Sequence, residues 1–173
     1  MGVFYLIMEV NTKMAQNFIS FANKHAVAGS TRLAATTETG GEGIMDLKIT
    51  LDLDNGTIIG KGNYVAGQVY AMTAPTAFTG KILSEKAANG NWYVEVATAT
   101  NAYLVLQVPV TYYDFNSQAK AESTFYNANG DIVRAYKLYP GDVFELSSEG
   151  FDGTPAANAT VSFDATTYKV EVQ

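Results

Sequence analysis

The chain has 173 residues, contains no cysteine and carries a formal net charge of −6 at pH 7. Its length allows one medium domain or two small ones, and the lack of cysteine excludes disulfides and thiolate metal sites. The negative charge opposes binding to nucleic acid. Charged residues make up 16% of the chain against about 25% in an average domain, and this composition favours an all-β fold.

The first predicted elements are a strand and a short helix. The apolar run from Val3 to Met8 ends at Glu9 and lacks a basic start, so it indicates a strand rather than a signal peptide. Thr12 is a good N-cap, and apolar residues follow it at helical spacing, which predicts a helix over residues 12–24. No apolar run approaches the ~20 residues that span a bilayer, so no membrane partner is expected.

Residues 1–43 are predicted to form an N-terminal arm. Its last part, residues 29–43, is rich in Ala, Thr and Gly without periodicity, which indicates an extended arm, a functional loop or disorder. The arm also carries large apolar side chains, each worth about 1.5–3 kcal/mol when buried. They could be buried in the protein's own core, but we expect them to bind a partner: Phe4, Leu6, Phe18 and Phe21.

Residues 44–110 are predicted to form a first β unit. Apolar and polar residues alternate over 46–53, as in a strand with one buried face. The pair Asn55-Gly56 predicts a tight hairpin turn, and strands are expected over 57–65, 69–73 and 92–96. The apolar run over 103–108 predicts a strand buried on both faces, which is expected to join the first unit to the second.

Residues 111–173 are predicted to form a second β unit, unless the two units merge into one domain. Strands are expected over 122–126, 132–139, 143–147 and 168–172, with a hairpin turn at Asn129-Gly130.

The two units resemble each other at an offset of 74 residues. Asn55, Gly56, Ile58, Gly67 and Val69 align with Asn129, Gly130, Ile132, Gly141 and Val143. Two unrelated hairpins would share turn residues and β-branched residues by composition alone, so coincidence is the alternative. The fixed offset favours an internal duplication of antiparallel units, each a β-sandwich or barrel-like.

Few residues suit catalysis, and no catalytic, cofactor or metal site is predicted. His25 is the only histidine, so a Ser-His-Asp triad would need it, and a polar residue at a helix end is the simpler interpretation. Four carboxylates would suit a glycosidase only if two of them faced each other across a cleft, and acids on solvated turns are more common: Asp142, Glu145, Glu149 and Asp152.

Aromatic residues raise the alternative of a carbohydrate-binding β-sandwich of a surface or fibre protein, because exposed rings stack on sugars. Packing within and between strands is the competing interpretation and the one we favour. The residues concerned are Trp92, Tyr93, Tyr103, Tyr112, Tyr113, Phe115, Tyr126, Tyr136 and Tyr139.

The stretch over residues 134–147, with Gly153-Thr154-Pro155-Ala156 after it, resembles the small capsid decoration (cement) proteins of tailed bacteriophages. The resemblance covers about the last third of the chain and has no counterpart for residues 1–33. It implies a non-enzymatic virion protein that sits on the capsid exterior, bridges major capsid subunits and stabilises their lattice. A homo-oligomer is expected, and another virion part, such as a tail-tube subunit, is a further alternative.

Overall fold

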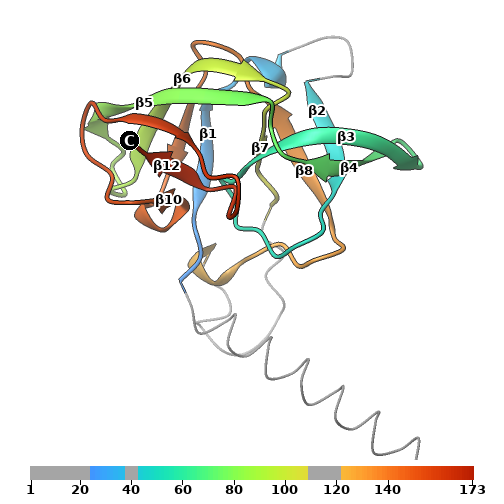
Figure 1. Ribbon diagram of the computed structural model, residues 1–173. Helices are drawn as coiled ribbons and strands as arrows, with labels where there is room; N and C mark the ends of the chain where they lie inside the picture. Colours follow the sequence, from blue (N-terminus) through green and yellow to red (C-terminus); the bar gives the residue numbers. More distant parts are fainter. Residues whose placement is uncertain (1–23, 38–42, 109–121) are drawn as a thin grey trace, which may run out of the picture.

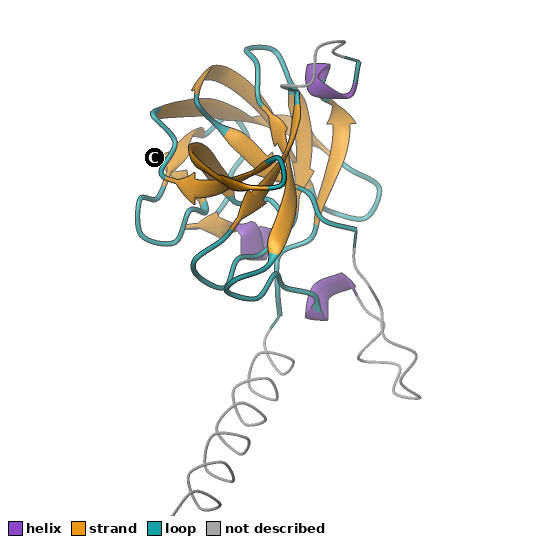
Figure 2. Cartoon of the chain, turned by 90° about the vertical axis from the view of Figure 1, so that its right-hand side faces the viewer, coloured by secondary structure: helices purple, strands orange, loops and turns teal. Residues whose placement is uncertain are grey.

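The computed structural model describes residues 24–37, 43–108 and 122–173 (Figure 1). Strands dominate this part of the chain, and its helices are three short 3₁₀ turns at Ala34–Thr36, Glu122–Thr124 and Ser148–Gly150. Figure 2 shows these turns at the periphery of a body built from strands. The all-β prediction is confirmed. Two predicted elements lie outside the described residues: the strand expected over 3–8 and, except for its last residue, the helix expected over 12–24. The same holds for the four predicted contact residues, Phe4, Leu6, Phe18 and Phe21.

Seven strands form an open sheet. Neighbouring strands are antiparallel except β12 and β10, which are parallel. The order across the sheet is β1 (Ala28–Arg32), β9 (Val143–Leu146), β6 (Trp92–Thr100), β5 (Ala77–Lys86), β11 (Thr160–Phe163), β12 (Val170–Val172) and β10 (Phe151–Asp152).

Five further strands close into a barrel. They follow each other around it as β2 (Ile44–Lys48), β4 (Val69–Thr73), β3 (Ile58–Ala66), β7 (Tyr103–Val105) and β8 (Ile132–Lys137). The pairing of β2 with β4 is parallel, whereas the other described pairings in the barrel are antiparallel. The barrel-like prediction is therefore confirmed. The antiparallel pairing that was expected holds for most strand pairs, but each sheet also contains one parallel pair.

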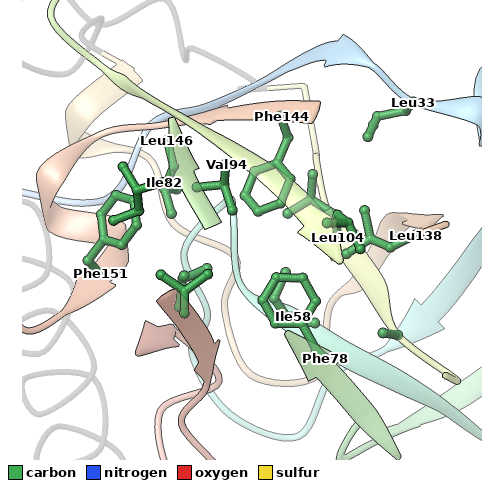
Figure 3. Close-up of a cluster of buried hydrophobic side chains, with 14 of the residues drawn as sticks. Leu33, Ile58, Phe78, Ile82, Val94, Leu104, Leu138, Phe144, Leu146 and Phe151 are labelled. Carbon is green, nitrogen blue, oxygen red and sulfur yellow. The ribbon is translucent and has the colours of Figure 1, made fainter. Parts of the chain in front are cut away.

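Two hydrophobic clusters meet at the barrel wall. One fills the space between the open sheet and the barrel, and Figure 3 shows Ile58, Phe78 and Phe144 from three strands pointing into it. The other fills the barrel. Leu104 belongs to the first cluster and its neighbours Tyr103 and Val105 to the second. The prediction of a strand buried on both faces is confirmed, because β7 separates the two cores.

Several predicted strands have nearly the expected bounds. The strand expected over 69–73 is β4, and the one expected over 57–65 is β3. The strand expected over 46–53 is β2, which covers 44–48 and ends earlier than expected, although the alternation holds in it, with Met45 and Leu47 buried and Asp46 and Lys48 exposed. The strand expected over 122–126 was wrong in form, because residues 122–124 make a 3₁₀ turn.

The structure does not confirm the internal duplication. In the first segment, β3 and β4 pair with each other across the Gly67-Gln68 turn, where both residues have positive φ (59° and 67°) as a type I′ turn requires. In the second segment, β8 lies in the barrel and β9 in the open sheet. The Asn-Gly pairs also fail to form the expected hairpins: β2 pairs with β4 and β8, and not with β3. The two segments therefore have different topologies.

The stretch from Gly29 to Gly43 was expected to be an extended arm, and its described part belongs to the fold. β1 pairs with β9, and Leu33 and Ala35 are buried at 4% and 3% exposure. The strands of the expected first and second β units are also interleaved, since β8 closes the barrel of β2, β4, β3 and β7.

Candidate functional site

Residues 24–27, which we call the arm root, are held by side chains from distant parts of the sequence. The Nδ1 atom of His25 lies 2.6 Å from Oδ1 of Asp54, and the backbone N–H of Ala26 donates to Oδ2 of the same carboxylate at 3.0 Å. The His25 ring also stacks on Tyr126, with centroids 5.1 Å apart. Both carboxylate oxygens of Asp54 therefore hold the arm root in place.

The arm root also contacts the 3₁₀ turn at Glu122–Thr124. The backbone N–H of His25 donates to the carbonyl oxygen of Ser123 at 2.7 Å. Val27 and Val108 line the same groove. The arm root, Val108 and Ser123 therefore lie close together in the fold.

This groove, which we call the root groove, has a volume of about 250 Å³. It runs between the start of the open sheet and the barrel, and no charged residue lines it. Its walls are residues 26–28 and Ser30 on one side and Asn55, residues 106–108 and Tyr136 on the other. Val108 is 75% exposed there, so an apolar side chain is available to a ligand or a partner.

One wall of the root groove is held by a side-chain amide. Asn55 is only 6% exposed. Its Nδ2 donates to the carbonyl oxygen of Gln107 at 2.8 Å, and its Oδ1 accepts from the Gln107 backbone N–H at 3.0 Å. This pair of bonds imitates a strand pairing, so the wall is rigid without being part of a sheet.

The four acidic residues singled out in the sequence are dispersed. Asp142 is buried, and its two carboxylate oxygens accept from the backbone N–H groups of Ala34 and Tyr139, each at 2.9 Å. Glu145 accepts from Asn89 and Asn91. Asp142 lines a second groove of about 460 Å³ beside residues 30–37, and none of the four lines the root groove.

The remaining two acids differ in their surroundings. A hydrogen bond from the Ser147 side chain is the main reason why the pKa of Glu149 lies below its usual 4.5, while Asp152 is exposed on β10. No two of the four acids meet across either groove, so the arrangement that a glycosidase requires is not formed.

Aromatic side chains in the described part of the chain are mostly used in packing. Tyr103 is buried, and Trp92 and Tyr136 are half-buried against the first cluster. Lys86 Nζ lies 3.8 Å from the centroid of the Trp92 ring. Among the described aromatic residues, Tyr64 at the tip of the β3–β4 hairpin is the one exposed at 60%. The packing interpretation is therefore favoured for those that are described, and Tyr112, Tyr113 and Phe115 lie outside them.

Residues 24–37, 43–108 and 122–173 bring together no group of three or more metal-ligating side chains. Within these same ranges, no helix is long and apolar enough to cross a membrane.

The sequence did not reveal the arm root or the root groove. His25 was interpreted as a polar residue at a helix end and Asp54 as part of a hairpin turn. The two residues are 29 positions apart, and Asn55 and Gln107 are 52 apart, so no local pattern could connect them.

Comparison of the chain with protein-family models, with curated proteins and with solved structures finds no match.

Proposed function

We propose that this chain is a non-enzymatic structural protein of a tailed-bacteriophage virion that binds the outer lattice of major capsid subunits and stabilises it. The proposal starts from the resemblance of residues 134–147 and 153–156 to capsid decoration proteins. It places the protein on the capsid exterior and expects it to act as a homo-oligomer.

The observation that carries the proposal is the arm root. A binder of this kind needs a body that keeps its shape and a segment that reaches a neighbour. The two cores and the closed barrel supply the body. Asp54 anchors the chain at His25 and Ala26, and residues 1–23 precede this anchor in the sequence. That segment contains the proposed contact residues Phe4, Leu6, Phe18 and Phe21.

The use of the polar residues also supports a structural role. The carboxylates of Asp54, Asp142 and Glu145 accept hydrogen bonds from other groups of the same chain. The carbohydrate-binding alternative needs a platform of exposed rings, and among the described residues Tyr64 alone is that exposed.

The test is cosedimentation of the purified full-length chain with empty capsids assembled from the major capsid protein of the same phage. We expect saturable binding with a fixed number of copies per capsid and a higher capsid melting temperature. Binding no greater than that of an unrelated acidic protein, or no change in capsid stability, would overturn the proposal.

The contact residues are tested by the double substitution Phe18→Ala and Phe21→Ala. Because each buried Phe is worth about 1.5–3 kcal/mol, binding should weaken by roughly 100-fold or more. The matched control is Tyr64→Ala, which removes an exposed aromatic ring at the β3–β4 tip and should leave binding unchanged. Equal losses in both variants would argue against the arm as the contact.

A further inference from the structure

Within the described residues, β1 forms an unpaired edge of the open sheet, and this edge lies beside the root groove. β1 stands first in the strand order, and β9 is its one partner in the described chain. The carbonyl oxygen of Val27 accepts from the N–H of Ser147 at 2.8 Å. Since bonding alternates along an antiparallel pair, the backbone N–H and C=O groups of Ala28 and Ser30 face the open side. Such an edge can accept another strand.

The side chains at this edge define what kind of strand would fit. Ala28 and Ser30 line the root groove together with Leu106, Val108 and Tyr136 of the opposite wall, and no charged side chain is among its lining residues. An added strand would place every second side chain between these walls. The edge therefore suits an uncharged, apolar segment of about the length of β1, which has five residues.

We propose that the strand that pairs with β1 is residues 3–8 of a second copy of this chain. Val3-Phe4-Tyr5-Leu6-Ile7-Met8 is an uncharged run of six residues with strand-forming side chains. It belongs to the 23 residues that precede the arm root, and the root itself lines the groove through Ala26 and Val27. This inference rests on the proposed function for the role of the contact, and it names a second copy as the arm's partner.

The same chain is a poorer donor than a second copy. If residues 3–8 of the same chain paired antiparallel with β1, residue 8 would lie near the start of β1. The helix expected over residues 12–24 would then carry the chain about 20 Å away, and the three residues between residue 8 and this helix are too few to span that distance. If residues 3–8 instead paired parallel with β1 of the same chain, the distance could be spanned, but the helix would have to lie across one face of the sheet. The inner face is already covered by the barrel.

The outer face of the sheet does not suit the apolar side of that helix. Glu145, Glu95 and Lys81 lie on this face, on neighbouring strands β9, β6 and β5, and Glu145 is bonded to Asn89 and Asn91. Packing Phe18 and Phe21 there would remove these charged side chains from water, which is costly. Donation between two copies avoids this cost.

Disulfide trapping tests the contact without any capsid, because the natural chain has no cysteine. An affinity-tagged Leu6→Cys chain is mixed with an untagged Ser30→Cys chain and oxidised. We expect a disulfide-linked dimer that contains one chain of each kind. As the control, Ser84→Cys on β5 is exposed but does not line the root groove, and with it no such dimer should form.

The double variant Leu6→Cys, Ser30→Cys separates the two possible donors. Donation between copies gives linked dimers and longer chains at high protein concentration. A monomer that closes its own disulfide would overturn the inference in favour of the same chain. Absence of the mixed dimer, or equal trapping at Ser84→Cys, would also overturn it. Failure of capsid binding with the dimer intact would instead count against the proposed function alone.

Discussion

At the scale of single residues, Gly56 and Gly130 have different surroundings, although they occupy equivalent positions in the two Asn-Gly pairs. Gly56 and Gly130 have φ values of +87° and +93°, a region that residues other than glycine rarely adopt. A Cβ atom on Gly56 would lie 2.3 Å from Leu146 Cδ1 and 3.1 Å from Ala28 Cβ, whereas a Cβ atom on Gly130 would meet nothing within 4 Å. The first glycine therefore carries a packing constraint that the second lacks.

We predict that Gly56→Ala destabilises the protein much more than Gly130→Ala. The shared positive φ should cost each variant about 1–2 kcal/mol, and the collision with Leu146 should add about 1–3 kcal/mol at Gly56. Urea unfolding of the two variants measures the difference. Equal losses of unfolding free energy would show that Leu146 moves aside without cost.

A second prediction at this scale concerns pH. Asp164 closes the turn between β11 and β12, and its carboxylate accepts from the backbone N–H of Thr166 at 2.5 Å and from the hydroxyl of Thr167 at 3.0 Å. The Thr166 bond is the main cause that lowers the pKa of Asp164 below its usual 3.8. A lowered pKa in the folded state stabilises the fold above the unfolded value, and this stabilisation disappears as the pH falls through the folded value.

Asp164→Ala should therefore be less stable than the natural chain at pH 7. The difference in unfolding free energy between the two chains should become smaller below pH 3.8. The measurement is the difference between the two urea midpoints at pH 7 and at pH 3, in which contributions from all other groups cancel. A gap of constant size across this range would contradict the prediction.

At the scale of elements, β1 is the strand on which the assembly inference depends. Proline at position 30 removes a backbone N–H that faces the open side of the sheet, and strand edges tolerate proline there. Ser30→Pro should therefore abolish the pairing between copies while leaving the bonds to β9 in place. Sedimentation velocity measures the association, and Ser30→Ala, which keeps the N–H, is the matched control. Undiminished association of the folded proline variant would exclude pairing at this edge.

At the scale of the whole molecule, residues 24–37 were expected to belong to the arm, but they belong to the fold, because β1 lies within them and pairs with β9. Deleting residues 1–23 keeps β1 and the bonds of Asp54 to His25 and Ala26, so the remaining chain should fold. Deleting residues 1–43 also removes β1 and the buried side chains of Leu33 and Ala35, of which Leu33 alone is worth about 1.5–3 kcal/mol.

We predict that the shorter deletion unfolds cooperatively near the melting temperature of the full chain and that the longer deletion is strongly destabilised. Thermal unfolding followed by circular dichroism compares the two truncations. Loss of the folded state in the shorter deletion would show that residues 1–23 belong to the core rather than to an arm.

Local patterns in the sequence determined the strand-rich class and several strands. Alternation of apolar and polar residues placed β2, because one side of this strand faces the barrel core. The apolar run over 103–108 predicted a strand buried on both faces, and β7 (Tyr103–Val105) is that strand. Positive φ at Gly56 and Gly130 was also predictable, since Asn-Gly favours tight turns whichever strands they connect.

Tertiary structure decided which strands pair and which segments belong to the fold. β1 has small or polar residues (Ala28-Gly29-Ser30-Thr31-Arg32), and it is a strand because β9 pairs with it. β5 shows a weakened alternation because Gly80 takes an inward position where a Cβ atom would lie 2.7 Å from the Glu95 carbonyl oxygen. The arm root joins residues 29 positions apart, and the root groove joins segments still more distant. Contacts of this range leave no local periodicity, because they are fixed by the packing of the two sheets and not by neighbouring residues.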